Sequence, residues 1–183
     1  DMSRCKDNYE LIGGGNKNYT QEVNQRINAY AVNTKTVRKD AVVMCNFIVT
    51  SDEETMKAMG AEKQRAYFDD TLKFLGKRYG SELIVNATVH MDETTPHLHV
   101  GLVPVKDGRL SAKNIFTRTE LKSLQTDFAN EVGKKYGLER GIEGSERTHL
   151  SEQRFKVKCA EEKQAKIQKD IEYQEKVKEK NEK

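Results

Sequence analysis

The sequence predicts an α+β fold, with a mainly antiparallel sheet, helices packed on one side of it, and a charged C-terminal helix. Two strand-like runs joined by a short polar loop indicate a hairpin. The wider order of helix, strand, helix, strand, strand, helix favours an antiparallel sheet with helices on one side. After about residue 150 the apolar residues become sparse while both signs of charge persist. We therefore expect one domain over 1–150 and a helical extension over 151–183.

The first predicted elements are a helix over 18–33 and a strand over 40–51. Val23 and Ile27 recur on one face at helical spacing, and Thr20 is a suitable N-cap. The run 40–51 is β-branched and apolar without helical period, which favours a strand buried on both faces. We expect it to be a central strand.

The middle of the chain predicts a helix followed by the hairpin. Residues 61–80 form a long amphipathic pattern that ends at Gly80, a suitable C-cap. The runs 83–91 and 97–105 read as two strands, with Pro96 at the entry of the second, where its missing N–H is tolerated. These two strands should pair directly.

A turn and a last helix complete the predicted domain. Asp107-Gly108 is a turn dipeptide, and residues 117–137 place Leu121 and Phe128 on one helical face. In the extension 151–183, a thin apolar seam leaves two interpretations open: a solvated helix or the start of a coiled coil that joins two copies.

Composition limits the class of protein only loosely. The net charge is +3, because 32 basic side chains nearly balance 29 acidic ones, so an anionic partner is weakly favoured. No apolar run has the roughly 20 residues of a membrane span. The three cysteines are widely spaced and odd in number, which suits a reducing cytoplasm better than a disulfide framework. We therefore expect a cytoplasmic protein.

Three of the four histidines, His90, His97 and His99, fall within ten positions. Side chains in a strand alternate between faces, so His97 and His99 point the same way, and His90 at the end of the partner strand can reach that face. Three imidazoles with open coordination positions are typical of a catalytic metal site. The alternative is that each histidine is satisfied by an ordinary hydrogen bond.

The loop between these histidines carries Asp92 and Glu93. A carboxylate there could accept a hydrogen bond from a metal-bound imidazole or move a proton at the site. Acids are also common in solvated loops, so either interpretation of Asp92 stays open.

These residues resemble a known family. His97-Leu98-His99 is similar to the histidine–hydrophobe–histidine motif of HUH endonucleases, which include rolling-circle replication initiators and conjugative relaxases. The segments "HMDETTPHLHVGLVPV", "RKDAVV", "NYEL", "RYG" and "GLERG" together resemble the MobV (Mob/Pre) plasmid relaxases, also called plasmid recombination enzymes. The similarity extends from about Arg4 to about Glu152.

The resemblance implies a metal-dependent relaxase with the HUH fold, encoded in bacteria by a plasmid or other mobile element. His90, His97 and His99 would bind Mn²⁺ or Mg²⁺, and Glu93 would act as an acid at the active site. Family members nick one DNA strand at a plasmid transfer origin by transesterification, in plasmid mobilisation, conjugation and recombination. Hard ions usually prefer oxygen ligands, so this choice of metal comes from the resemblance alone.

The sequence departs from the family pattern at the nucleophile. The family's attacking histidine lies in a motif that precedes "NYEL", and Lys6 stands where a histidine is usual. We therefore expect the chain to bind DNA without cleaving it efficiently. Tyr9 is an alternative nucleophile, although a DNA contact is the favoured role for it.

The resemblance also suggests DNA contacts. Tyr9 and Tyr79 would stack on bases, which contributes about 1–3 kcal/mol per base. Phosphates would be contacted by basic residues that include Arg4, Arg38, Lys39 and Lys113. The alternatives are ordinary packing for the tyrosines and solvated surface for the basic side chains.

Two other function classes remain open at this point. A histidine-triad nucleotide hydrolase also alternates histidines with aliphatic residues, but Gly101 stands where that triad needs its last histidine. The other class is a non-catalytic DNA-binding module that contains a structural metal.

Overall fold

The computed structural model describes residues 2–13, 18–32 and 37–144, with only the backbone for 2–4, and short stretches between 157 and 174. The chain divides into two compact units, Asp1–Gly141 and Ile142–Lys183. The predicted boundary at residue 150 lies outside the described residues. Those described in the second unit, between 157 and 174, are helical.

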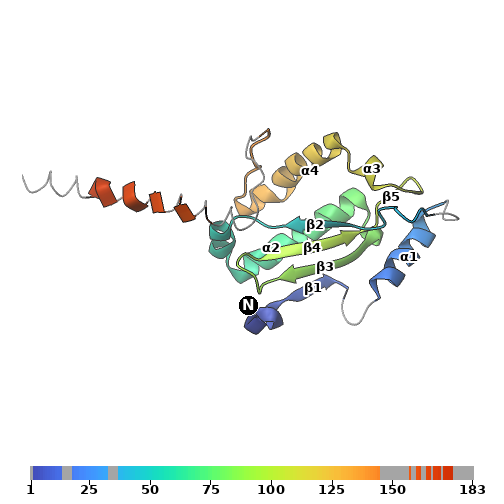
Figure 1. Cartoon of the computed structure of the whole chain (residues 1–183), viewed down its shortest axis with the longest axis horizontal. Helices are drawn as coiled ribbons and strands as arrows, with labels where there is room; N and C mark the ends of the chain where they lie inside the picture. The colour runs from blue at the N-terminus through green and yellow to red at the C-terminus, as the bar shows by residue number, and fades with distance from the viewer. Residues whose placement is uncertain are drawn as a thin grey trace, which may run out of the picture. The chain divides into compact units, whose positions relative to one another are not determined.

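The centre of the first unit is a four-stranded sheet. Its strand order is β1-β3-β4-β2, and every neighbouring pair is antiparallel (Figure 1). The strands are β1 Tyr9–Ile12, β2 Cys45–Val49, β3 Ile84–His90 and β4 His97–Leu102. The α+β class and the hairpin of β3 and β4 are confirmed.

Two features of the sheet differ from the prediction. β2 is an edge strand, so the expectation of a central strand buried on both faces is wrong. Its side chains alternate between half-buried and exposed, because only one face of the strand is covered. β1 was not predicted: it is only four residues long and follows a 3₁₀ helix, η1 Met2–Asp7.

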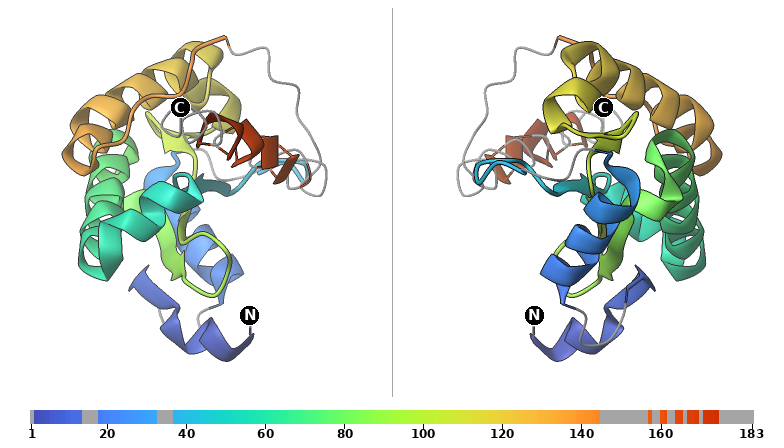
Figure 2. Two further views of the ribbon diagram at one scale, coloured as in Figure 1. Left: turned by 90° about the vertical axis from the view of Figure 1, so that its left-hand side faces the viewer. Right: turned by 90° about the vertical axis from the view of Figure 1, so that its right-hand side faces the viewer.

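Two long helices cover one side of the sheet, as Figure 2 shows for α2 Glu53–Tyr79 and α4 Arg118–Glu131. The shorter helix α1 Tyr19–Tyr30 packs near the start of β3, where Arg26 donates a hydrogen bond of 3.0 Å to the Ile84 carbonyl. Short elements complete the unit: η3 Ser81–Leu83, the hairpin of β5 Val105–Lys106 and β6 Arg109–Leu110, α3 Ala112–Ile115, and η4 Gly133–Tyr136.

Local sequence explains several of the helix ends and turns. The side chain of Asn18, rather than Thr20, caps α1. α2 begins before the predicted residue 61 because two helices join across Gly60, whose φ of 69° is not helical. Asp107 and Gly108 both have positive φ, as a tight two-residue hairpin turn requires.

The face of the sheet that meets the helices forms the core. Its strand side chains are fully or almost fully buried and aliphatic: Val85, Ala87, Val89, Leu98 and Val100. On the helix side, the ring of Tyr67 contacts Phe68, Phe128 and Tyr136 at centroid distances of 5.3–6.3 Å. Because side chains alternate along a strand, the other face is free to carry different chemistry.

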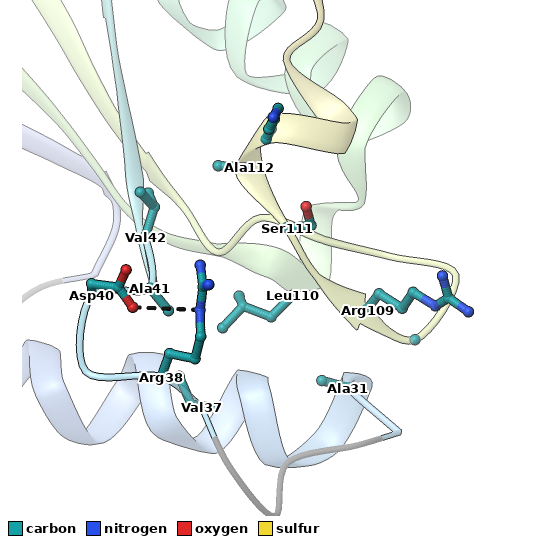
Figure 3. Close-up of a pocket in the computed structure, with 12 residues that line it drawn as sticks. Ala31, Val37, Arg38, Asp40, Ala41, Val42, Arg109, Leu110, Ser111 and Ala112 are labelled. Carbon is teal, nitrogen blue, oxygen red and sulfur yellow. Dashed lines mark ion pairs between the residues drawn. The ribbon is translucent and has the colours of Figure 1, made fainter.

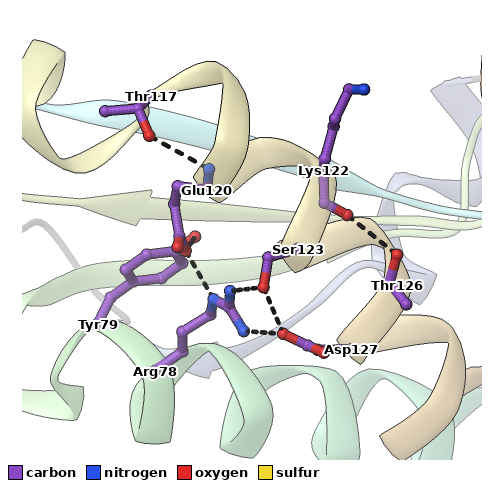
Figure 4. Close-up of polar contacts among 8 residues, drawn as sticks. All are labelled: Arg78, Tyr79, Thr117, Glu120, Lys122, Ser123, Thr126 and Asp127. Atoms are coloured by element: carbon purple, nitrogen blue, oxygen red, sulfur yellow. Dashed lines mark hydrogen bonds and ion pairs between the residues drawn. The ribbon is translucent and has the colours of Figure 1, made fainter.

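A polar network joins the end of α2 to α4 (Figure 4). The Arg78 guanidinium donates to Glu120 at 2.7 Å, to Asp127 at 2.8 Å and to Ser123 at 2.9 Å. The hydrogen bond and charge of Arg78 hold the pKa of the Glu120 carboxyl below its ordinary value. The network joins the two helices of this layer to each other.

Candidate metal centre

The three histidines converge on one face, at the end of the sheet where β3 leads into β4. His90 is directly opposite His97 in the register, and Thr88 is opposite His99. The distances between ring centroids are 5.2 Å for His90 and His97, 5.0 Å for His90 and His99, and 4.9 Å for His97 and His99. The predicted gathering of these side chains is therefore present in the structure.

A polar group lies beside Nδ1, here called the outer nitrogen, of each ring. Nδ1 of His97 lies 3.0 Å from the Thr95 carbonyl, which can only accept, so in the neutral ring Nδ1 carries the proton and Nε2 has the lone pair. Nδ1 of His99 lies 3.0 Å from the side-chain amide of Asn46. Contacts of this kind orient metal ligands in other proteins.

Asp92 provides the corresponding contact for His90, at 3.7 Å from Nδ1. The carboxylate accepts a hydrogen bond of 3.1 Å from the Cys5 thiol. This hydrogen bond lowers the pKa of the Asp92 carboxyl, and a hydrogen bond from Asn8 lowers it further. Asn8 also accepts from the Met91 backbone N–H at 2.7 Å, so the segment before β1 fastens the loop that follows His90.

The second loop acid, Glu93, is closer to solvent. Its side chain is 66% exposed, and its carboxylate lies 4.0 Å from Nε2 of His97. An acid in this position can exchange protons with solvent while it stays beside the imidazole group. The structure thus brings Glu93 to the histidines that it was predicted to join.

The chemistry of this cluster fits a divalent cation. Burial and the neighbouring His97 and His90 rings lower the pKa of His99, and metal binding requires the neutral ring that this favours. Among the described residues, no three histidine, cysteine or acidic side chains already have the geometry of a metal-binding site.

Gly101 lies two residues beyond His99 on the same strand, on the same face. A Cβ at this position would lie 2.2 Å from Oδ1 of Asn86. The space that a histidine-triad enzyme needs for its last histidine is therefore filled by Asn86.

The two predicted aromatic DNA contacts face the helices instead. Tyr9 is opposite the buried Val89, and its ring lies 4.8 Å from the Arg65 guanidinium of α2. Tyr79 packs on Phe47 at a centroid distance of 5.7 Å, and its hydroxyl donates to Glu120. Both rings therefore have packing partners on the side of the sheet opposite the histidines.

The predicted phosphate contacts lie away from the histidines. Arg38, Lys39 and Lys113 are exposed, and Arg38 and Lys113 line one cavity. The side chain of Arg4 lies outside the described residues. Sequence reasoning missed Asn8, Asn46 and Thr95. For Asn46, the available signal was strand alternation, which places it on the same face as Ile48, two positions further along β2.

Comparison with known proteins gives consistent matches. A family model described as plasmid recombination enzyme matches residues 1–157. A plasmid recombination enzyme from Bacillus sp. is 39% identical over 162 residues, which are 88% of this chain and 39% of the relative. One from Bacillus thuringiensis is 42% identical over 160 residues, 86% of this chain and 35% of the relative. The chain spans less than half the length of these relatives.

Solved structures of similar fold come from one relaxase domain. The MobM relaxase domain (MOBV; Mob_Pre), Mn-bound and in complex with 22-nucleotide oriT DNA of plasmid pMV158, superposes with a TM-score of 0.79 at 35% identity. The match covers 86% of this chain and 84% of that domain. A 23-nucleotide complex gives a TM-score of 0.80 at the same identity, covering 87% and 84% of the two chains.

Proposed function

The chain belongs to the plasmid recombination enzyme (Mob/Pre) family, and on that basis we propose that it is a metal-dependent relaxase domain that nicks one DNA strand at a plasmid transfer origin. The observation that carries the proposal is the convergence of three histidine rings, 4.9–5.2 Å apart, on one face of the sheet. The Mn-bound MobM domain in complex with oriT DNA supports it. The protein is a bacterial, plasmid- or mobile-element-encoded protein of the cytoplasm.

His90, His97 and His99 would hold Mn²⁺ or Mg²⁺ through Nε2. When bound, such an ion supplies positive charge that polarises a scissile phosphodiester and offsets the charge that develops on it. The chain's own residues prepare this site. Thr95, Asn46 and Asp92 lie beside Nδ1 of His97, His99 and His90, at 3.0, 3.0 and 3.7 Å, and contacts of this kind orient imidazole rings that bind metal through the other nitrogen.

Binding of a metal by His99 would require one particular orientation of the Asn46 side-chain amide. If Nε2 holds the metal, Nδ1 must carry the proton, and Asn46 must then present its amide oxygen to it. The two ends of an amide exchange by a simple flip of the group. Glu93, exposed beside His97, serves as the acid that takes or delivers a proton during transesterification.

We do not assign the nucleophile to Tyr9. Burial raises the pKa of its phenol, and its ring packs against Arg65 on the opposite side of the sheet. A phenol that attacks phosphorus must reach the phosphate that the metal holds. The attacking group is therefore a residue other than Tyr9.

The C-terminal unit would act as a helical arm that pairs with a second copy. Ile167 and Ile171 are 58% and 45% exposed and lie one helical turn apart, as in a thin coiled-coil seam. Light scattering on the full chain and on a chain that ends at Gly141 would test this: a dimer that persists without the extension contradicts it.

Strand cleavage tests the main proposal. An end-labelled oligonucleotide with the pMV158 oriT sequence is incubated with the chain and Mn²⁺ for hours and run on a denaturing gel. A Mn²⁺-dependent nick at one position, or a covalent adduct, supports the relaxase. A mobility shift that needs no metal and never leads to a cut would support the non-catalytic module. Release of a nucleotide from a dinucleotide substrate would support the triad hydrolase, which Gly101 already disfavours.

A further inference from the structure

A cavity of about 510 Å³ lies at the end of the sheet away from the histidines. The loop before β2 and the β5–β6 hairpin form its walls, and Figure 3 shows the Leu110 side chain directed toward that of Arg38, which is paired with Asp40. Aliphatic side chains line much of it, while Arg38, Asp40 and Lys113 supply charge at its edge. Its volume lies within the range of sites that bind small organic groups.

An exposed strip leads from this cavity to the histidines. Val42 lines the cavity and is 53% exposed, Met44 is 38% exposed, and Ile48 is 64% exposed. Ile48 is opposite His99 in the register. Met44 is on the histidine face too, because its sulfur lies 3.1 Å from the Cβ position of Gly101.

The distance along the strip follows from strand geometry. Ile48 lies six positions after Val42, which at about 3.3 Å per residue of extended chain corresponds to about 20 Å. Stacked nucleotides rise about 3.4 Å each, so roughly six would cover this distance. The 22-nucleotide DNA of the similar MobM complex is long enough to do so.

The chemistry of the strip selects one class of occupant. Successive bases present flat apolar faces, and their phosphates present negative charge, so single strands bind where apolar side chains adjoin cations. Here the apolar side chains are those of Val42, Met44 and Ile48, and the cations are Arg38 and Lys113. The solved complex of the similar MobM domain contains DNA, which offers both chemistries.

We propose that a single DNA strand runs along β2 to the metal site and that the cavity takes one unstacked base about six nucleotides from the nick. This inference rests on the proposed function. The Asp40 carboxylate and the Arg38 guanidinium, 3.4 Å apart, present an acceptor and a donor side by side. They can pair with a base edge that presents a donor beside an acceptor.

Fluorescence anisotropy with a labelled 22-nucleotide single strand of the pMV158 oriT sequence, in Mn²⁺ buffer, tests the strip. Val42→Asp places a carboxylate at the mouth of the cavity and is expected to weaken binding by about tenfold. Leu121→Asp is the matched control: Leu121 is 45% exposed, lies on α4, and should change binding by less than about twofold. Met44→Ala adds no charge and should weaken binding by about fivefold.

Oligonucleotides that each lack one base locate the pocket. In the wild type, one abasic position about six nucleotides from the nick should weaken binding by about fivefold, and in Val42→Asp the same change should cause no further loss. Equal binding by wild type and Val42→Asp, or an abasic loss that persists in the variant, overturns the inference.

The failure of the proposed function would look different. In that case the wild type itself would show no Mn²⁺-dependent nicking or adduct. If the wild type nicks the strand and Val42→Asp binds as tightly, only the inference fails. Unchanged Mn²⁺ affinity and unchanged melting temperature of Val42→Asp verify that the variant has lost neither the metal site nor the fold.

Discussion

The two faces of the sheet consist of the same strands but differ in composition: one face is apolar and buried, and the other carries the polar histidine cluster. Toward the helices, Leu98 and Val100 are completely buried. Toward the other face, His97 and His99 meet His90 and are held by polar neighbours. Adjacent residues of β4 therefore have different roles: Leu98 and Val100 contribute to the apolar core, and His97 and His99 contribute to the histidine cluster. The comparison predicts that substitutions on one face alter stability and those on the other alter binding.

The largest effect on stability is expected on the buried face. Leu98→Ala should lower the free energy of unfolding by about 2–5 kcal/mol, because it removes apolar contacts and leaves a cavity. Urea denaturation followed by circular dichroism measures this. If the loss is below about 1 kcal/mol, the division between the faces is not as sharp as the burial indicates.

The neighbouring residue should behave in the opposite way. His97→Ala should reduce Mn²⁺ affinity by at least about 100-fold, because a first ligand is lost, while the free energy of unfolding without metal changes by less than about 1 kcal/mol. Isothermal titration with Mn²⁺ and urea denaturation of the same samples check both parts. Unfolding of this variant would instead indicate a structural ion.

A smaller effect is expected at Asn46, which contacts His99 only through the outer ring nitrogen. Asn46→Ala should weaken Mn²⁺ binding by about tenfold, the lower end of the range for such supporting contacts. The control is Asn114→Ala on α3, an exposed asparagine far from the histidines in the sequence. Equal Mn²⁺ affinity in Asn46→Ala and wild type would contradict the orienting role.

The Arg78 network predicts a pH dependence on the helix side. Because Arg78 lowers the pKa of both Glu120 and Asp127, its contribution to stability is present at neutral pH and is lost as the carboxylates become protonated below their ordinary values of 4.5 and 3.8. Arg78→Gln should lower stability at pH 7 and flatten its decline between about pH 5 and 3. Identical acid dependence in variant and wild type would argue against the network.

The smallest effect is expected at Tyr67. Its hydroxyl is buried and has no hydrogen-bond partner among the described residues, and burial raises its pKa to about 12. Tyr67→Phe removes an unsatisfied polar atom, so stability should stay the same or rise by up to about 1 kcal/mol. A clear loss in urea denaturation would reveal a partner for the hydroxyl in solution.

The sequence by itself determined the features that depend on local spacing. Helical periodicity located α1 and α4, the Asp107-Gly108 dipeptide marked its hairpin, and alternation placed His97 and His99 on one face. These features follow from the 3.6-residue and two-residue repeats of helices and strands, which a single segment carries in full.

Only the tertiary structure decided which strand is at the edge and which side each tyrosine faces. The edge position of β2 depends on whether a further strand pairs beyond it, and its burial depends on which faces of the sheet are covered; its own apolar composition contains neither piece of information. Tyr9 and Tyr79 are paired with Arg65 and Glu120, 56 and 41 positions away in the sequence. Such contacts arise when distant segments pack together, so spacing along the chain cannot reveal them.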